Sequence, residues 1–446
     1  MTITRKILSA LLIILILFSG CSKSVSDEKS TTKDTFTIYI VKDTPINSLI
    51  KKYNENKANE KRIEIIEFEN NAELSSKLNT EIMADDGPDL IYFDSGFGSI
   101  SNIEKMMSLD MFADYNELLS NDNSDSKINL DNYDKTVMNS GVYNGKRYFM
   151  PISYMPDVLI TTKEVCDKYS VDFKKSIAYQ NVEESLSGFV KESKSTDNMS
   201  VFYDFSDEIY KLIDSNMDLF NRKNLLNSDS FLSDIDAIDN LISGYNPSED
   251  PTFSYGLDPL LQGNVVFVNL EQIAGSEPNS IGSIYYYIRS KGQTPIILNS
   301  LSNSENTYSA FFDKGLLINK NSDRKSESYE FVKYMLSEKT QCSPEIGLPV
   351  NKNARSKLIE EMAETDAKSF GVDYDKDTVD DYYINSYISF LDGINNCSFK
   401  NNYFNHSVIG DSVSKYINGE IKKEQFVKEI QGKAEIRSEE HTSELQ

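Results

Sequence analysis

The sequence has no tryptophan, only two histidines and only four cysteines in 446 residues. Two histidines are too few for a zinc site built from several imidazoles, and the HExxH and GxSxG motifs of common hydrolases are missing. After Cys21 come Cys166, Cys342 and Cys397, an odd number without CxxC spacing, which indicates neither a disulfide framework nor a zinc ribbon. We therefore predict no metal, no catalytic residues and no other cofactor.

Positive charge is also scarce. The chain has 46 Lys and Arg against 70 Asp and Glu, which gives a net charge of −24. Nucleic-acid phosphates repel such a chain, and no block of basic residues offsets this, so nucleic-acid binding is disfavoured. Pairs of carboxylates that could hydrolyse a glycosidic bond are abundant here, and this abundance makes them uninformative.

No apolar run is long enough to cross a membrane. The longest, Ile7–Phe18, follows Arg5 and Lys6. As a helix it would rise about 18 Å, well short of the roughly 30 Å hydrocarbon core of a bilayer. A short apolar run behind basic residues is typical of an export signal, so we predict a signal peptide at residues 1–20.

The residues around Cys21 resemble a bacterial lipoprotein signal. Ser19 and Gly20 precede the cysteine, although Phe18 stands where the pattern usually has leucine. The resemblance implies that Cys21 becomes the lipidated N-terminus and anchors the protein to the cell membrane on its extracytoplasmic side. Residues 21–35 have almost nothing to bury, as expected of a flexible tether. The alternative is an ordinary cleavable signal with an incidental cysteine.

The last ten residues, 437–446, read "RSEEHTSELQ". They follow a helical pattern without continuing it, and they resemble the translation of a DNA-sequencing adapter. We expect a non-native tail without function.

The intervening part of the chain has roughly 410 residues and is too long for one compact core, since single cores stop growing near about 250 to 300 residues. It opens with three β-branched or apolar runs, "FTIYIV", "RIEIIEF" and "LIYF". Between them lie two helical stripes, formed by Ile46, Leu49, Ile50 and Tyr53 and by Leu74, Leu78 and Ile82. This βαβαβ order predicts an α/β domain with a mostly parallel sheet.

The stretch after Asn144-Gly145 predicts a passage between two lobes. Asn-Gly flanked by "GVY" and "KRYF" is typical of a tight hairpin, because both turn positions need positive φ. The returning strand meets Pro151 and Pro156, which cannot donate ladder hydrogen bonds, so it should leave its sheet nearby. A new strand then begins at "VLIT".

The second region repeats the alternation less clearly. Strands are predicted at "MSVFYDF", "NVVFVNL", "TPIILNS" and "GLLINKN", and a helical stripe is formed by Phe231, Ile235, Ile238 and Ile242. A helix with Phe331, Tyr334 and Met335 on one face follows. From Asn353 onward the pattern is mostly helical, and it ends in two helices separated by Gly419.

Four segments resemble the extracellular solute-binding proteins of ABC importers, in the maltose-binding-protein-like family. They are "GPDLIYFDSG", "YNGKRYFMPISYMPDVLITTKEV", "GLLINKNSDRKSESYEFVKYMLSEKTQ" with "GLPVNKNAR", and "SKYINGEIKKEQFVKEI". The resemblance implies a two-lobed periplasmic-binding-protein type II fold, a clamshell with three hinge crossings near Ser153, Phe312 and Gly347. The implied lobes are 36–153 plus 313–347, and 154–312 plus 348–436.

In open α/β sheets ligands bind beyond the carboxyl ends of strands, and pockets favour domain interfaces. Candidate solute contacts therefore follow the predicted strands, lie at the crossing or lie near the C-terminal helices, with Asp94 preferred. After the strands come Lys42, Asp43, Asp94, Ser95, Asp204, Phe205, Asn269 and Glu271, at the crossing Tyr154 and Met155, and near the C-terminal helices Tyr403 and Phe404. Their carboxylates and amides can bond hydroxyl groups, and aromatic rings offer flat apolar faces to sugar rings. Each could equally be a helix cap or a core residue.

The resemblance implies that an extracellular solute is captured between the lobes and delivered to the membrane subunits of an ABC permease, with no enzymatic step and as a monomer. An oligosaccharide or other carbohydrate is the first expectation, and a peptide is close behind. The family's sugar binders usually stack tryptophan on the ligand, whereas this chain offers 26 tyrosines and 23 phenylalanines. A secreted hydrolase and a sensor or adhesin without a transport role remain the alternatives.

Overall fold

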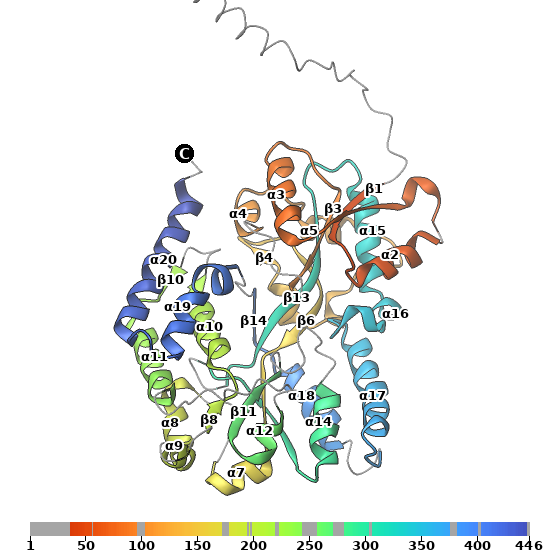
Figure 1. Cartoon of the computed structure of the whole chain (residues 1–446). Helices are drawn as coiled ribbons and strands as arrows, with labels where there is room; N and C mark the ends of the chain where they lie inside the picture. Colours follow the sequence, from red (N-terminus) through yellow and green to blue (C-terminus); the bar gives the residue numbers. More distant parts are fainter. Residues whose placement is uncertain are drawn as a thin grey trace, which may run out of the picture.

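The protein was analysed as a computed structural model (Figure 1). The structure describes residues 36–55, 57–95, 103–171, 178–193, 196, 199–218, 223–242, 257–270, 281–302, 306–374, 381–399 and 403–443. The predicted signal peptide, the tether and Cys21 lie outside this range.

Two sheets organise the described residues. The first has six strands there: β1 (Phe36–Val41), β2 (Ile63–Phe68), β3 (Leu90–Asp94), β6 (Met150–Pro156), β13 (Ser309–Ile318) and β14 (Asn396–Ser398). The second has four there: β7 (Val158–Thr162), β8 (Ser200–Phe202), β11 (Val265–Asn269) and β12 (Pro295–Asn299). We call each sheet with the helices packed on it the first and the second lobe.

The predicted βαβαβ unit forms the start of the first lobe. Strand β1 pairs in parallel with both β2 and β3. The connecting helices are α2 (Ile46–Glu55) and α3 (Asn71–Ile82), and the residues of both predicted stripes are buried. Side chains alternate along β1, so that Ile38 and Ile40 join one core cluster and Tyr39 and Val41 the other. Helices therefore cover both faces of this sheet, as expected for a parallel α/β unit.

The hairpin at Asn144-Gly145 is confirmed. Strands β4 (Val142–Tyr143) and β5 (Lys146–Arg147) pair antiparallel. Asn144 has φ of 50° and Gly145 has φ of 79°, the left-handed values that this turn requires.

Both prolines of the next stretch remain inside a strand. Strand β6 pairs antiparallel with β13, and the register shifts twice around Lys314. On its other side β6 contacts an irregular segment, where Tyr154 N donates to Leu348 O at 3.2 Å. Such an edge with bulges is where a sheet tolerates prolines.

The chain leaves the first sheet directly after Pro156. Asp157 is the single residue between β6 and β7, and β7 pairs antiparallel with β12 and β11 in the second sheet. The return occurs between β12 and β13, and a third passage leads from Val350 into a long helix that packs on the second lobe. The predicted crossings at Ser153 and Phe312 lie inside β6 and β13, whereas the predicted lobe boundaries themselves stay a prediction.

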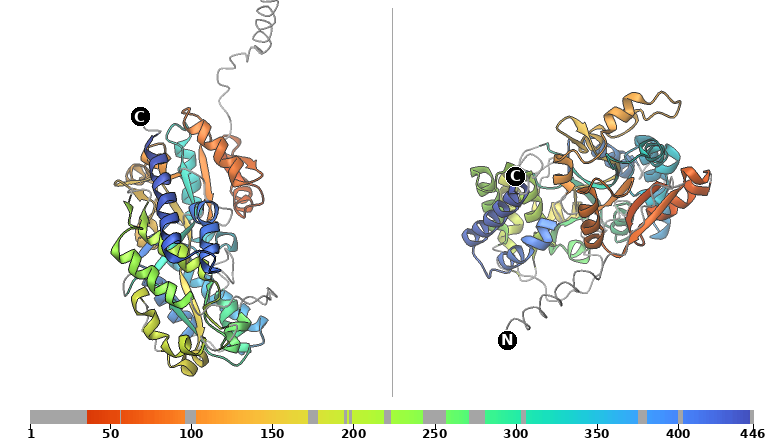
Figure 2. Two further views of the ribbon diagram at one scale, coloured as in Figure 1. Left: turned by 60° about the vertical axis from the view of Figure 1, so that its left-hand side comes forward. Right: turned by 90° about the horizontal axis from the view of Figure 1, so that it is seen from above.

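The remaining helices cover the two sheets (Figure 1). In the first lobe these are α4 (Ile103–Ser108), α5 (Tyr115–Asn121), α6 (Lys135–Asn139), α15 (Lys325–Leu336) and α16 (Glu338–Gln341). Around the second sheet lie α7 (Lys163–Tyr169), α8 (Val182–Ser185), α9 (Ser187–Ser193), α10 (Phe205–Asn216), α11 (Asp229–Ile242), α12 (Leu257–Gln262), α14 (Ile281–Ser290), α17 (Lys352–Ser369), α18 (Ser386–Asp392), α19 (Gly410–Ile417) and α20 (Lys423–Ser443). Helices α10, α11, α19 and α20 pack together, side by side in both views of Figure 2.

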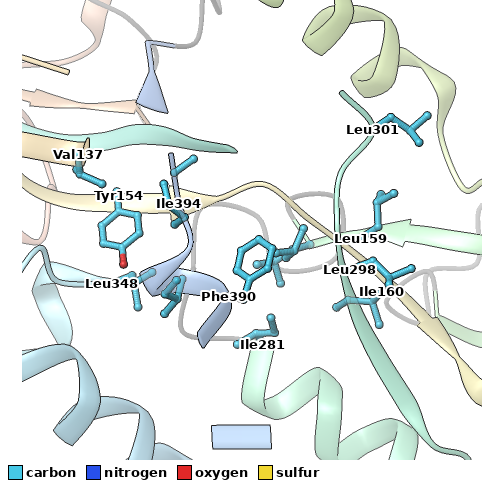
Figure 3. Close-up of a cluster of buried hydrophobic side chains, with 14 of the residues drawn as sticks. Val137, Tyr154, Leu159, Ile160, Ile281, Leu298, Leu301, Leu348, Phe390 and Ile394 are labelled. Carbon is cyan, nitrogen blue, oxygen red and sulfur yellow. The ribbon is translucent and has the colours of Figure 1, made fainter. Parts of the chain in front are cut away.

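One hydrophobic core runs beneath the passage between the sheets (Figure 3). Tyr154 of β6 and Leu159 of β7 belong to the same cluster of buried side chains, which also includes Phe390 of α18 and Ile281 of α14. The two lobes are therefore joined by packed apolar contacts as well as by the chain.

The end of the chain is mostly helical, as predicted, with one short strand that was not predicted: Asn396–Ser398 forms β14 and pairs in parallel with the start of β13. One prediction needs correction. Helix α20 runs to Ser443, so helical structure continues beyond Ile436, where the helical pattern in the sequence stops. Gly419 separates α19 from α20 as predicted, with φ of 74°. Within the described residues, none of the helices combines the length and apolar character needed to span a bilayer.

Candidate functional site

The carboxyl ends of β1, β2 and β3 lie at the same edge of the first sheet, since these strands run parallel. Lys42 and Asp43 follow β1, and both are exposed. The Lys42 ammonium forms an ion pair at 3.2 Å with Glu69, which follows β2, and this hydrogen bond raises the pKa of Lys42. Polar groups thus gather at this edge, as the strand order predicted.

Asp94 ends β3 and is buried, with 7% of its surface exposed. Its Oδ2 accepts a hydrogen bond of 2.9 Å from the Tyr92 hydroxyl. Burial first, and the charge of Asp94 second, raise the pKa of Tyr92 well above its usual value, so this hydroxyl remains a donor. Across the ladder Asp94 faces Lys314 of β13.

A fully buried carboxylate next to Asp94 escaped the sequence analysis. Asp313 of β13 accepts from Ser95 Oγ at 2.9 Å, from Ser153 Oγ at 2.8 Å and from Lys314 Nζ at 2.8 Å. We call Ser95, Ser153, Asp313 and Lys314 the Asp313 cluster. It ties the end of β3 to both antiparallel strands at the passage. The signal in the sequence was an adjacent Asp-Lys pair inside the otherwise apolar "FFDKGLL".

Tyr154 and Met155 lie in β6 at the passage, and little of either side chain is exposed. Tyr154 has no exposed surface, and its hydroxyl accepts from Arg355 Nη1 at 3.1 Å. Arg355 of α17 also pairs with Asp392. Met155 is 5% exposed and is the register partner of Phe311. Tyr154 thus connects β6 to helix α17 on the second lobe, whereas the described partner of Met155 lies in the first sheet.

Asp204 and Phe205 start helix α10 in the second lobe. The Asp204 carboxylate accepts from Ser206 N at 2.7 Å as a helix cap, and burial raises the pKa of Asp204. Phe205 is fully buried in the core. The structure therefore places Asp204 in the role of a cap, the alternative that the sequence had left open.

Asn269 ends β11 and lies against a second buried polar group. Its Nδ2 donates to Glu208 Oε1 at 3.4 Å, and Glu208 is 1% exposed. Lys211 Nζ lies 3.0 Å from the same Glu208 oxygen and 2.6 Å from Asp157 Oδ1. Glu208 was not predicted, because its i, i+3 spacing to Lys211 is typical of an exposed ion pair on a helix.

Of the last two candidates, Phe404 belongs to a different part of the core from an aromatic group that was not predicted. Phe404 is fully buried, Tyr403 begins a π-helical turn (Tyr403–Val408), and the structure describes nothing of its side chain. Half-buried Phe399 stacks on Phe312, with ring centroids 4.8 Å apart and planes at 19°. Phe93 and Phe149 complete this aromatic group. Glu271 lies outside the described residues.

Of the predicted residues, Asp94 and Ser95 lie together at the end of β3, where Ser95 bonds to Asp313. Asn269 is linked to Asp157, between β6 and β7, through Glu208 and Lys211. The aromatic residues Phe93 and Phe312 directly precede Asp94 and Asp313 and share one buried cluster, so ring surface and carboxylates lie close together in sequence at this passage. Such a site can accept hydrogen bonds and offer apolar ring surface. Within the described part of the chain, no three His, Cys, Asp or Glu side chains are grouped so that they could hold a metal ion.

Comparisons with known proteins identify the fold. Neither a protein-family model nor a curated protein sequence matches the chain. Among solved structures, the sugar-binding protein MalE from the phytopathogen Xanthomonas citri is similar with a TM-score of 0.61 at 14% identity, over 92% of this chain and 99% of that one. The ABC substrate-binding protein Lmo0181 from Listeria monocytogenes, in complex with cycloalternan, is similar with a TM-score of 0.56 at 16% identity, over 90% and 97%.

These likenesses confirm the predicted fold class. The chain has the two-lobed α/β fold of periplasmic binding proteins over about nine-tenths of its length.

Proposed function

We propose that this protein captures an extracellular carbohydrate, in the first instance an oligosaccharide, between its two lobes and delivers it to an ABC permease. The observation that supports the proposal most strongly is the likeness of nearly the whole chain to two solved binding proteins, one named as a sugar-binding protein and one as an ABC substrate-binding protein in complex with cycloalternan. Closure of two lobes around a solute excludes water and strengthens each polar contact.

The residues at the strand ends support a polar, hydroxyl-rich solute. Asp94 and Asn269 would accept or donate hydrogen bonds from the two lobes, with Lys42, Asp43, Ser95 and Asp204 around them. Phe399 would offer a ring face where related sugar binders use tryptophan, because it is half-buried and already held by Phe312. The remaining predicted contacts, Tyr154, Met155, Phe205, Glu271, Tyr403 and Phe404, stay predictions.

The proposed setting is the outer face of the cell membrane. Cys21 would carry the lipid anchor, residues 21–35 would form the tether, and the protein would act as a monomer. Intact-mass measurement of the membrane-extracted protein should show a lipid-modified N-terminus at Cys21. A free thiol there would contradict the anchor without affecting solute binding.

A thermal-shift screen tests the proposed function. The purified protein is heated with mono- and oligosaccharides and with peptides, each at about 1 mM. A ligand present at about 100 times its dissociation constant adds about 2.7 kcal/mol to the free energy of unfolding, which is an easily measured shift. We expect shifts with oligosaccharides. If only peptides raise the melting temperature, the solute is a peptide and not a carbohydrate. Turnover of a bound sugar would indicate a hydrolase.

A further inference from the structure

A buried lysine in the second lobe holds together two of the three passages between the lobes, the one from β6 to β7 and the one from β12 to β13. Lys211 Nζ forms an ion pair with Asp157 Oδ1 at 2.6 Å and donates to Ser300 Oγ at 3.0 Å. Asp157 is the residue between β6 and β7, and Ser300 directly follows β12. Ser300 Oγ also donates to Asp157 Oδ1 at 2.6 Å. One ammonium group therefore contacts both passages.

Lys211 itself lies in helix α10, so its contacts join these passages to that helix. Its third partner is Glu208 Oε1 at 3.0 Å, one turn earlier in the same helix. We call Asp157, Glu208, Lys211 and Ser300 the Lys211 cluster. Each member is at most 6% exposed, so water competes little with these contacts and each of them is strengthened. Although burial alone would lower the pKa of Lys211, Asp157 and Glu208 raise it, which keeps the ammonium charged.

Helix α10 also leads to the proposed solute edge of the second lobe. Asp204 caps its first turn, and Glu208 accepts a hydrogen bond from Asn269 at the end of β11. A change in the position of α10 would therefore move Asp204 and Asn269, and it would also pull on Asp157 and Ser300. Solute contacts and the passages thus share one rigid element.

We propose that Lys211 is a positioning residue that sets the angle between the two lobes by joining both passages to helix α10. It touches no solute. Its effect on affinity rests on the proposed function, because a fixed lobe angle matters for binding only if the solute is held between the lobes. Its effect on the shape of the empty protein does not depend on any solute.

The chain supplies a matched control for this proposal. Lys333 in α15 is also buried, pairs with Asp122 at 3.4 Å and Glu330 at 2.6 Å, and donates to Ser124 Oγ at 3.2 Å. It thus has two carboxylates and one serine as partners, like Lys211, but all of them lie in the first lobe. Lys211→Met should lower the melting temperature more than Lys333→Met, because both carboxylate partners of Lys211 are buried whereas the Glu330 side chain is 51% exposed, so the two variants are compared by their shape and not by their stability.

Small-angle X-ray scattering of the empty protein separates the two variants. We expect a broadened distance distribution and a changed radius of gyration for Lys211→Met and the wild-type curve for Lys333→Met. Affinity for the best-binding oligosaccharide should fall about tenfold for Lys211→Met alone, as expected if the fraction of binding-competent molecules falls about tenfold.

A second pair of variants decides the question if Lys211→Met does not fold. Ser300→Ala removes the hydroxyl bridge but keeps the ion pairs. Its control is Ser412→Ala in α19, because Ser412 is also buried between a carboxylate, Glu429 at 2.8 Å, and an ammonium, Lys433 at 2.8 Å. A shape change in Ser300→Ala alone supports the proposal, and identical scattering of both serine variants and the wild type overturns it. A shape change in a protein that binds no carbohydrate would support the lobe-angle role and contradict the proposed function.

Discussion

Two buried carboxylates flank the passages between the sheets, and their surroundings differ. Asp313, in the first lobe, has both oxygens bonded, by two hydroxyls and one ammonium. Glu208, in the second lobe, shares Oε1 between Lys211 and Asn269, while its Oε2 is buried without a hydrogen-bond partner among the described residues. The helix packed next to it contains Asp234, of which neither oxygen has such a partner there.

This difference indicates distinct roles for the two sides. A fully bonded buried carboxylate fixes its neighbours and is costly to disturb. A buried carboxyl group with an unbonded oxygen favours its protonated form, so its contribution to stability depends on pH. We therefore expect Asp234 to make the stability of the second lobe depend on pH.

Removal of Asp313 should have the largest effect. Asp313→Ala takes one partner from buried Lys314 and the acceptor from two serines, so we expect the free energy of unfolding to fall by about 3 to 5 kcal/mol. Urea unfolding at neutral pH measures this loss. The control is Glu69→Ala, which removes an exposed ion pair with Lys42 and should cost about 0 to 1 kcal/mol. Similar losses in the two variants would mean that Asp313 does not hold the passage.

Replacement of Asp234 tests the pH response of the second lobe. Burial raises the pKa of Asp234 to about 6, although Gln180 acts in the opposite direction. A carboxyl group with a raised folded pKa stabilises the fold below its unfolded pKa of about 4, and this contribution is lost as pH rises through about 6. Asp234→Asn keeps the shape and removes the charge. It should therefore be more stable than the wild type by about 2 kcal/mol at pH 8 and about equal to it at pH 4.

Unfolding measured at both pH values decides this prediction. Tyr179, fully buried nearby, feels the charges of Glu208, Asp157 and Asp234, and its own raised pKa leaves it neutral throughout this range. The gain in stability of Asp234→Asn at pH 8 should therefore come from the loss of the Asp234 charge alone. A constant difference between the variant and the wild type from pH 4 to pH 8 would show that Asp234 is ionised in the fold.

A milder change at Asp94 tests the solute-binding edge of the first lobe. Asp94→Asn preserves an acceptor for the Tyr92 hydroxyl, so the free energy of unfolding of the empty protein should change by less than about 1 kcal/mol. Affinity for an oligosaccharide, measured by calorimetry, should fall about tenfold, because a charged acceptor bonds hydroxyl groups more strongly than a neutral one. Unchanged affinity would remove Asp94 from the proposed site.

Alanine substitutions at two glycines should change the free energy of unfolding least, and with opposite signs. Gly145 has φ of 79°, whereas Gly432 lies in helix α20 without a positive φ, and a Cβ at either would meet no atom within 4 Å. Gly145→Ala should cost about 1 kcal/mol, since L-residues disfavour this region. Gly432→Ala should instead stabilise by up to about 1 kcal/mol. Chemical denaturation measures the free energy of unfolding of both variants. Changes of the same sign in the two variants would contradict the argument from backbone conformation.

The first lobe could be predicted in detail because its signals are local. The strands at Phe36–Val41, Ile63–Phe68 and Leu90–Asp94 are apolar runs between helices with clear stripes, and the Asn-Gly turn needs no distant partner. Strand β14 could not be predicted, because Asn396–Ser398 is short and polar and is extended only by its pairing with β13.

The candidate site could be predicted only in part. Asp94 and Asn269 follow strands, and their positions come from strand order. Glu208 and Lys211 look like an ordinary exposed i, i+3 pair on a helix, and only the packing of α10 against the passages buries them. Phe399 meets Phe312 through a contact between distant segments, which periodicity does not reveal.

The central claim is that two lobes close around a carbohydrate. Small-angle X-ray scattering of the wild-type protein, with and without a saturating oligosaccharide found in the thermal-shift screen, tests it most directly. The account predicts a smaller radius of gyration and a narrower distance distribution when the sugar is bound. Superimposable curves with and without a sugar that demonstrably binds would contradict it.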